Sequence, residues 1–186
     1  MSTHNIFFLG PSGIGKSTVV KRISESSDRF KGVSLDTIAL QSGIKNGMID
    51  SSVTSAYDLL KSIGSEAFFM VGITALYREI GRRKSTRILL IDVGAAFQNQ
   101  PLLASLFRFE KTICLYASPE DSFSRYTKNR DDSRTFSDHK EIEFSRTRRK
   151  LYDGAGKVFD TSSMSLEMTV SEVEEYLYSS YLKPSA

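Results

Sequence analysis

The sequence predicts an α/β fold with three layers, in which helices cover both faces of a parallel five-stranded sheet. Short apolar runs recur along the 186-residue chain, and segments whose apolar residues follow helical spacing separate them. Strands that alternate with helices in this way form parallel sheets that are buried on both faces. A glycine-rich turn at residues 10–18 joins the first apolar run to the first helical segment.

The strands are predicted where apolar runs are short and bounded by polar or turn-forming residues. The run at residues 87–91 is the strongest of them, and the run at 33–35 is short and weak. The predicted strands span residues 6–9, 33–35, 87–91, 111–117 and 157–159.

The helices are predicted from apolar residues that stand three or four positions apart. Pro101 and Pro119 fall in the first turns of two of them, where proline is well tolerated. Residues 129–137 are polar and charged without apolar spacing, which predicts a mobile loop. The predicted helices span residues 17–23, 65–79, 100–107, 119–128, 138–152 and 166–182.

The length of the chain suits one buried core, so we expect a single domain over residues 1–186. The sequence has no basic and apolar leader and no apolar run of membrane-spanning length, and we therefore expect a cytoplasmic protein without a membrane partner. The single cysteine, Cys114, lies within an apolar run and is expected in the core. One cysteine alone forms no disulfide or zinc framework.

The charge of the chain is concentrated in one segment. The formal net charge is +3, and residues 125–150 hold nine Lys or Arg against five Asp or Glu. A nucleic-acid-binding protein would instead carry basic side chains along much of one face. We therefore expect no nucleic-acid partner. We separately expect a small-molecule ligand and a monomer or weak homodimer.

Residues 10–18 read Gly-Pro-Ser-Gly-Ile-Gly-Lys-Ser-Thr and match the phosphate-binding loop G-x-x-x-x-G-K-[ST] between a strand and a helix. This predicts a P-loop NTPase-type fold that binds a nucleoside triphosphate, ATP or GTP, with Mg²⁺. Backbone N–H groups and the helix N-terminus would face the phosphates, Lys16 would reach the β- and γ-phosphates, and the Ser17 hydroxyl would ligate Mg²⁺. The predicted nucleotide-binding residues of the loop are Gly10, Pro11, Ser12, Gly13, Ile14, Gly15, Lys16, Ser17 and Thr18.

Two carboxylates are predicted at the same edge of the sheet as this loop. Asp92 directly follows the strongest strand, and we expect it to hold Mg²⁺, directly or through water; the alternative is a cap of the next turn. Asp36 ends the second predicted strand, whose carboxyl end opens into the crevice where ligands collect in such sheets. We expect Asp36 to contact the acceptor as the catalytic base; the alternative is an ordinary helix N-cap.

Cationic side chains supply the remaining candidates. Arg125 and Arg134 belong to a basic segment at 125–138, which we expect to close over the nucleotide as a mobile lid. Arg134 would also stabilise charge on the transferring phosphoryl group. Arg148 follows the lid, and its planar guanidinium suits an anionic acceptor.

Taken together, these features resemble the shikimate kinase family of small P-loop kinases, over nearly the whole chain. Residues 115–120 are similar to the family's strand and helix before the lid, and 134–136 stand where the family has its lid Arg-Pro-Leu. Residues 148–153 resemble its Arg-x-x-Leu-Tyr motif, and 158–161 its last strand. The resemblance implies that Arg134 is the lid arginine on the ATP side and that Arg148 contacts a carboxylate of the acceptor.

The departures from the family pattern fall mostly on the acceptor side. Asp36 is an inexact substitute for the family's Asp-x-Asp, and Phe69 replaces its acceptor-binding arginine. Gly94 belongs to a changed glycine run, which follows an aspartate that the family usually lacks. We place Asp36, Phe69, Gly94 and Arg148 in the predicted acceptor site.

The expected function is therefore ATP-dependent phosphoryl transfer to a hydroxyl of a small metabolite other than shikimate. Lys16, Asp36, Asp92 and Arg134 are the predicted catalytic residues, and Ser17 and Asp92 the predicted metal ligands. The alternatives are an authentic shikimate kinase and a non-catalytic, nucleotide-binding regulatory protein of the same fold.

Overall fold

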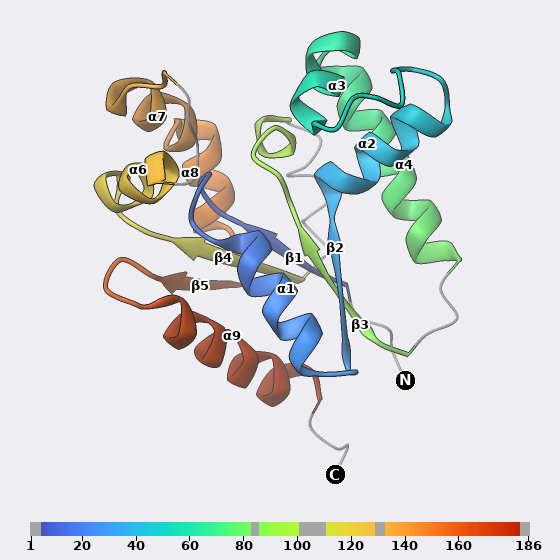
Figure 1. Cartoon of the computed structure of the whole chain (residues 1–186). Helices are drawn as coiled ribbons and strands as arrows, with labels where there is room; N and C mark the ends of the chain where they lie inside the picture. The colour runs from blue at the N-terminus through green and yellow to red at the C-terminus, as the bar shows by residue number, and fades with distance from the viewer. Residues whose placement is uncertain (1–4, 83–85, 101–110, 129–132, 183–186) are drawn as a thin grey trace.

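The computed structural model describes residues 5–82, 86–100, 111–128 and 133–182 (Figure 1). Its strands form one five-stranded sheet in which every hydrogen-bonded pair of neighbours is parallel. This is the predicted α/β architecture. In sheet order the strands are β2 (Phe30–Ser34), β3 (Ile88–Asp92), β1 (Asn5–Leu9), β4 (Lys111–Tyr116) and β5 (Lys157–Asp160).

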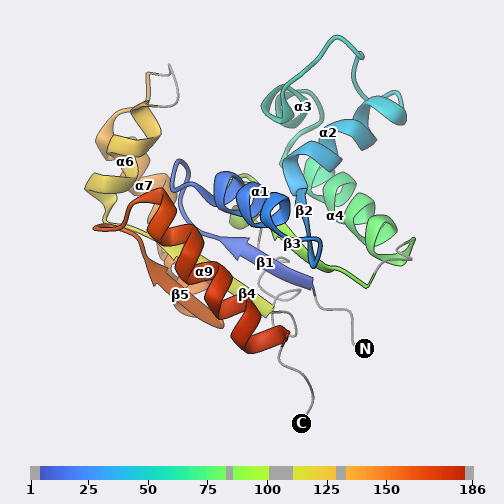
Figure 2. The same ribbon diagram turned by 60° about the horizontal axis from the view of Figure 1, so that its bottom comes forward.

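Alternation along the central strands divides the core into two layers. In β1, Ile6 and Phe8 join the cluster on one face of the sheet, whereas Phe7 and Leu9 join the cluster on the other. Helices α1 (Lys16–Ser26) and α9 (Leu166–Tyr181) cover the first face, which Figure 2 turns toward the viewer. The opposite face is covered by α2 (Leu35–Lys45), α4 (Ser65–Gly81) and α8 (Arg146–Asp153).

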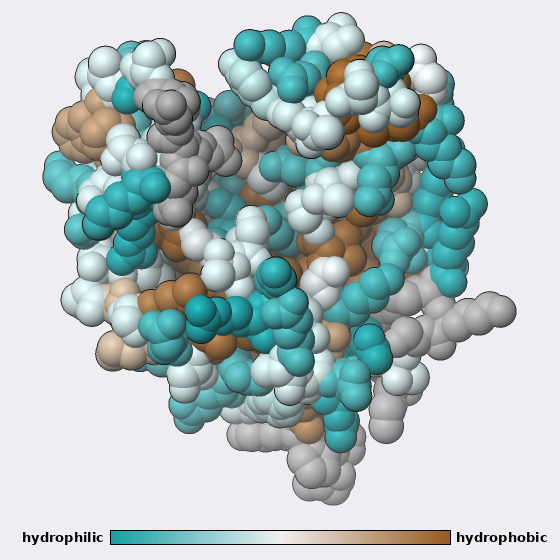
Figure 3. Space-filling model, viewed as in Figure 1, coloured by the Kyte–Doolittle hydropathy of each residue, from teal (hydrophilic) through white to brown (hydrophobic). Residues whose placement is uncertain are grey.

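Two groups of helices stand beyond the carboxyl ends of the strands (Figure 1). One contains α6 (Pro119–Lys128) and α7 (Phe136–Glu143), and the other contains α2, α3 (Ala56–Ile63) and α4. The space-filling view shows a hollow between the two groups (Figure 3). The phosphate-binding loop lies at this edge of the sheet, because it directly follows the central strand β1.

Most predicted elements are present, with shifted boundaries. The predicted helix at 65–79 is α4, and Cys114 is fully buried in β4, as expected. The predicted helix at 138–152 is wrong as one helix, because the chain breaks after Glu143 and Ser145 caps a new helix. The η1 turn at Phe97–Asn99 and helix α3 were not predicted.

The predicted helix at 100–107 and the predicted loop at 129–137 lie partly outside the residues that the structure describes. The predicted helix at 100–107 lies outside the described residues from 101 onward, as do residues 129–132 of the predicted loop. Residue Phe136, at the end of that loop, instead begins α7, where Thr135 and Asp138 form a capping box. Within the described ranges no helix is both long and apolar enough to cross a membrane.

Candidate active site

The phosphate-binding loop has the backbone conformation that its glycines permit. Gly10, Gly13 and Gly15 all have positive φ, at 134°, 80° and 99°. A side chain on Gly10 would meet the backbone oxygen of Leu115 at 2.0 Å, so the loop packs directly against β4. Gly15 is the N-cap of α1 and provides no side-chain cap, which leaves the first amide groups of the helix facing the loop.

Gln98 lies in the η1 turn after β3 and forms two hydrogen bonds to Gly10, the first residue of this loop. Its side-chain oxygen accepts from the Gly10 amide at 3.2 Å, and its side-chain nitrogen donates to the Gly10 carbonyl at 3.1 Å. The same nitrogen donates to the Val93 carbonyl at 2.9 Å. Gln98 is 1% exposed, so these bonds form within the protein interior.

Lys16 is buried and folded back over the loop. Its Nζ donates to the carbonyls of Gly10 at 2.8 Å and Pro11 at 2.9 Å. Burial lowers the pKa of Lys16, while the carboxylates of Asp92 and Glu143 act in the opposite direction. The ammonium group thus lies at the phosphate end of the site, held by backbone oxygens.

Asp92 and Ser17 meet at the end of β3. The Ser17 hydroxyl donates to Asp92 Oδ2 at 2.5 Å, and Asp92 is 5% exposed. The second carboxylate oxygen, Oδ1, is buried and has no hydrogen-bond partner among the residues that the structure describes. A hydroxyl beside a carboxylate with an uncommitted oxygen is a donor set that suits Mg²⁺, so these two predicted ligands fit the metal.

Asp36 is not at the end of a strand and is not a helix cap, which corrects both sequence-based interpretations. Strand β2 ends at Ser34, whose side chain accepts from the Thr37 amide at 3.3 Å and thereby caps α2. Asp36 is the second residue of that helix. Its carboxylate lies so close to Gly94 that a side chain there would meet Oδ1 at 2.1 Å.

Because the Asp36 carboxylate lies so close to Gly94, the substitution Gly94→Ala is a specific probe of Asp36. The added methyl group would displace the Asp36 carboxylate, and a shift of about 1 Å in a catalytic group costs on the order of 100-fold in turnover. We expect that loss in kcat, with nucleotide affinity in calorimetry close to that of the wild type. Gly81→Ala, where the added methyl group would meet no atom within 4 Å, serves as the control; equal turnover in Gly94→Ala and wild type would contradict a role for Asp36.

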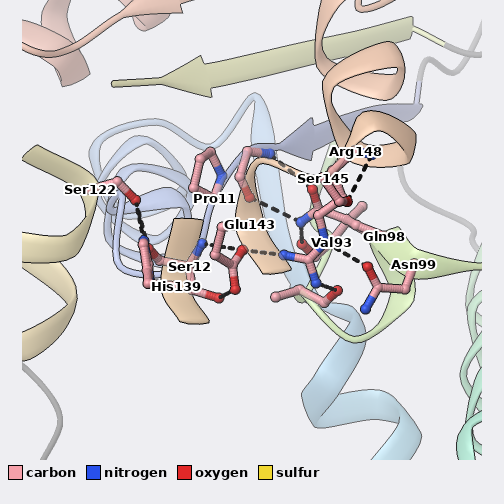
Figure 4. A network of polar contacts seen from close by, with 12 residues as sticks. Pro11, Ser12, Val93, Gln98, Asn99, Ser122, His139, Glu143, Ser145 and Arg148 are labelled. Atoms are coloured by element: carbon pink, nitrogen blue, oxygen red, sulfur yellow. Dashed lines mark hydrogen bonds and ion pairs between the residues drawn. The ribbon is translucent and has the colours of Figure 1, made fainter. Parts of the chain in front are cut away.

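Glu143 lies at the centre of the site and was not predicted from the sequence (Figure 4). Its carboxylate accepts from the Ser12 amide at 3.0 Å and from the Ser12 hydroxyl at 2.8 Å. It also forms ion pairs with Arg134, at 3.3 Å, and with Arg148 Nη1. The last residue of α7 is therefore attached to the phosphate-binding loop and to both predicted arginines.

Arg148 is enclosed by these contacts. Its Nε donates to Asn99 Oδ1 at 2.7 Å, and its Nη2 donates to the Ala95 carbonyl at 2.8 Å. Burial raises the pKa of Glu143, but Arg148, the two Ser12 hydrogen bonds and Lys16 outweigh it and hold that pKa below its ordinary value of 4.5. The lowered pKa keeps Glu143 ionised beside Arg148, and both residues are 1% exposed, so the pair is almost inaccessible to water.

Because Glu143 neutralises a buried guanidinium, Glu143→Gln should lower the free energy of unfolding by about 3 kcal/mol. The depressed pKa places this stabilisation above pH 4.5 and removes it as the pH falls through the folded-state value. Chemical denaturation at several pH values checks this, with the exposed Glu141→Gln as the control. A stability difference that stays constant into acid would contradict the pairing.

A cavity of about 790 Å³ joins these groups, within the usual size range of ligand sites of roughly 300–1,000 Å³. Its lining brings together Lys16, Ser17, Asp36, Asp92 and Gly94, as predicted. Other predicted residues that line it are Ser12, Gly13, Gly15, Thr18, Arg134 and Arg148, and unpredicted ones include Asn99, Tyr57, Phe68 and Glu143.

The cavity lining does not include the predicted residues Phe69, Ile14 and Arg125. Phe69 packs on Phe97 in the core and is not part of the cavity lining, whereas the preceding residue Phe68, which also packs on Phe97, is part of it. Ile14 is buried in the core below the loop. Arg125 bonds to Thr161, at 2.9 Å to its hydroxyl and 2.5 Å to its carbonyl, rather than lining this cavity.

Solved structures of similar fold were found over nearly the whole chain. Shikimate kinase from Bacteroides thetaiotaomicron has a TM-score of 0.70 at 15% identity, covering 96% of this chain and 98% of that one. Shikimate kinase from Acinetobacter baumannii in complex with shikimate has a TM-score of 0.67 at 19% identity, covering 98% and 97%. The enzyme from Aquifex aeolicus gives 0.66 at 18% identity, covering 97% and 99%.

A curated protein is similar in sequence. Nucleoside-triphosphatase THEP1 from Natranaerobius thermophilus is 29% identical over 164 residues, covering 71% of this chain and 93% of that protein. No family model matches the chain. The predicted resemblance is thus confirmed: this chain has the fold of the shikimate kinases, with the phosphate-binding loop of a small P-loop kinase-like protein.

Proposed function

We propose that the protein is an ATP- and Mg²⁺-dependent phosphotransferase that moves the γ-phosphate to a hydroxyl group of a small molecule. The observation that carries this proposal is the placement of Asp36 in the same cavity as the phosphate-binding loop. A phosphotransferase needs the γ-phosphate held at one end of a site and an acceptor hydroxyl positioned at the other.

Each residue of the site has a defined part in this proposal. Lys16 and the loop amides bind the phosphates, and Ser17 and Asp92 would hold Mg²⁺, which neutralises charge on the β- and γ-phosphates. Asp36 accepts the proton of the acceptor hydroxyl as its oxygen attacks phosphorus, and ADP leaves. Arg134 compensates the charge that develops on the transferring group.

A second function, hydrolysis of a nucleoside triphosphate, is favoured by the sequence similarity to a nucleoside-triphosphatase. In that reaction Asp36 would orient a water molecule in place of the acceptor hydroxyl. The two reactions differ in one observable, because only phosphoryl transfer consumes a second substrate.

The test is ADP formation from Mg-ATP, measured alone and with a panel of hydroxylated metabolites. Under the proposal, at least one compound raises ADP formation well above the rate without acceptor and appears as its phosphate ester by mass spectrometry. ADP formation that no acceptor changes, with inorganic phosphate as the product, would show hydrolysis instead. Nucleotide binding without any turnover would favour a regulatory protein.

Shikimate belongs in this panel, and we expect it to be a poor substrate. The sequence-based reason for this, an apolar ring at Phe69, no longer holds, because that ring lies in the core. The structural reason is that Arg148, the arginine expected to bind a carboxylate of the acceptor, already forms an ion pair with Glu143. A kcat/KM for shikimate at or above roughly 10⁴ M⁻¹s⁻¹ would contradict this expectation.

A further inference from the structure

The acceptor end of the cavity contains a guanidinium group whose charge is already balanced. Arg148 is 1% exposed, and each of its three nitrogens donates to a protein oxygen, on Glu143, Asn99 and Ala95. Three of the five N–H donors are thus engaged, one on each nitrogen, and a ligand carboxylate binds best to a bidentate edge whose donors are free.

The carboxylate that balances it is held from several sides. Glu143 accepts two hydrogen bonds from Ser12 and pairs with Arg148 (Figure 4). It also pairs with Arg134, so its partners come from three separate segments of the chain. Displacing Glu143 would leave a buried ion without partners, which is costly. Its position is therefore a fixed property of the site.

An anionic acceptor would meet this carboxylate at close range. A ligand carboxylate that approached Arg148 would lie beside Glu143, and two carboxylates that share one site repel each other strongly. Asp36, on the same cavity, adds a further negative charge. An uncharged acceptor avoids both interactions.

The lining contributed by α3, its N-cap and α4 is uncharged. Ser55, Ala56, Tyr57 and Leu60 come from the start of α3, and Phe68 comes from α4. Tyr57 is 61% exposed, and Lys61 Nζ lies 4.4 Å from its ring centroid. Apolar and aromatic surfaces of this kind bind the apolar part or ring of a small molecule, and the Asn99 amide group and the Ser55 hydroxyl are the polar side chains beside them.

We propose that Glu143 sets the class of acceptor: the site takes an uncharged hydroxyl compound that carries an apolar or aromatic part, and excludes compounds with a carboxylate at that position. This inference rests on the proposed function, since it names the substrate class of the same cavity. Glu143 acts through Arg148 and is a specificity-determining residue, separate from the proton acceptor Asp36.

The experiment uses pairs of probes that differ by one carboxylate: shikimate with its methyl ester, and orotidine with uridine. Their affinities are measured by calorimetry in the presence of Mg²⁺ and a non-hydrolysable ATP analogue. The proteins are the wild type, Glu143→Gln, and Glu141→Gln, which changes an exposed carboxylate two residues away on the same helix.

Glu143→Gln frees Arg148 for a ligand, so we expect its affinity for at least one carboxylate probe to rise about 10- to 100-fold over the wild type. The affinities of the neutral partners and of Glu141→Gln stay at the wild-type values. The inference is overturned if the wild type binds the carboxylate member of either pair more tightly than the neutral one. It is also overturned if Glu143→Gln gains no affinity for either carboxylate.

The double variant Glu143→Gln, Arg148→Gln removes both buried charges and guards against the stability loss expected of the single variant. Its carboxylate affinities should not fall below those of the wild type, because Arg148 binds no ligand carboxylate in the wild type and the repelling Glu143 carboxylate is gone. A lower carboxylate affinity in the double variant than in the wild type would contradict the proposal. Because binding is measured, failure of this inference differs from failure of the proposed function, which appears only as absent phosphoryl transfer.

Discussion

Lys16→Ala should weaken the binding of Mg-ATP by between about 30-fold and several thousand-fold, and abolish turnover. Losing one charged partner of a buried ion contact costs about 2 to 5 kcal/mol, which corresponds to that range. The ammonium group lies at the loop and is 7% exposed, so no solvent-exposed cation can replace it. Calorimetry with ATP and Mg²⁺ measures the effect directly.

Lys21 provides the matched control for this substitution. It lies on the same helix, is exposed, and forms an i,i+4 pair with Glu25 at 3.9 Å. Lys21→Ala should leave nucleotide affinity close to that of the wild type. Equal affinities in wild type and Lys16→Ala would show that the loop does not bind nucleotide as we propose.

The two carboxylates should give different defects, and this separates their roles. Asp36→Asn should lower kcat by about 10²- to 10⁴-fold, the usual contribution of a general base, with nucleotide affinity nearly intact. Asp92→Asn should lower turnover and also raise the Mg²⁺ concentration required for nucleotide binding, because its carboxylate lies against the Ser17 hydroxyl.

Asp58→Asn, an exposed carboxylate on α3, is the control for both variants. The measurements are initial rates across a Mg²⁺ series with an identified acceptor. If Asp36→Asn and Asp92→Asn both turn over the acceptor at the wild-type rate, the assignment of both carboxylates is wrong.

The parts of the site that the sequence could predict are those with local causes. The loop at residues 10–18 needs glycines at fixed positions before a helix, and the structure has positive φ at three of those glycines. Asp92 could be placed because it directly follows an apolar run, and a run of that kind forms a central parallel strand. Both inferences depend on neighbours in the sequence.

The parts that could not be predicted depend on tertiary contacts or on one residue of register. Phe68 and Phe69 are adjacent in a helix, and spacing alone does not say which of them faces the cavity. Glu143 and Ser12 lie 131 positions apart, so no local pattern joins them. Glu143 ends α7, and the break before α8 brings it to Arg148. The one local signal of this break is Ser145, a residue type that often caps a new helix.

The double hydrogen bond between Gln98 and Gly10 has a consequence for the nucleotide cycle. When Lys16 turns from the loop carbonyls to a bound phosphate, the Gly10 carbonyl keeps its bond from Gln98 at 3.1 Å. A buried carbonyl that loses every donor would cost about 1 to 3 kcal/mol, and at Gly10 this cost does not arise. Gln98 therefore keeps the Gly10 carbonyl satisfied wherever the Lys16 ammonium lies; this holds for Gly10 and not for the Pro11 carbonyl, which Lys16 also contacts at 2.9 Å.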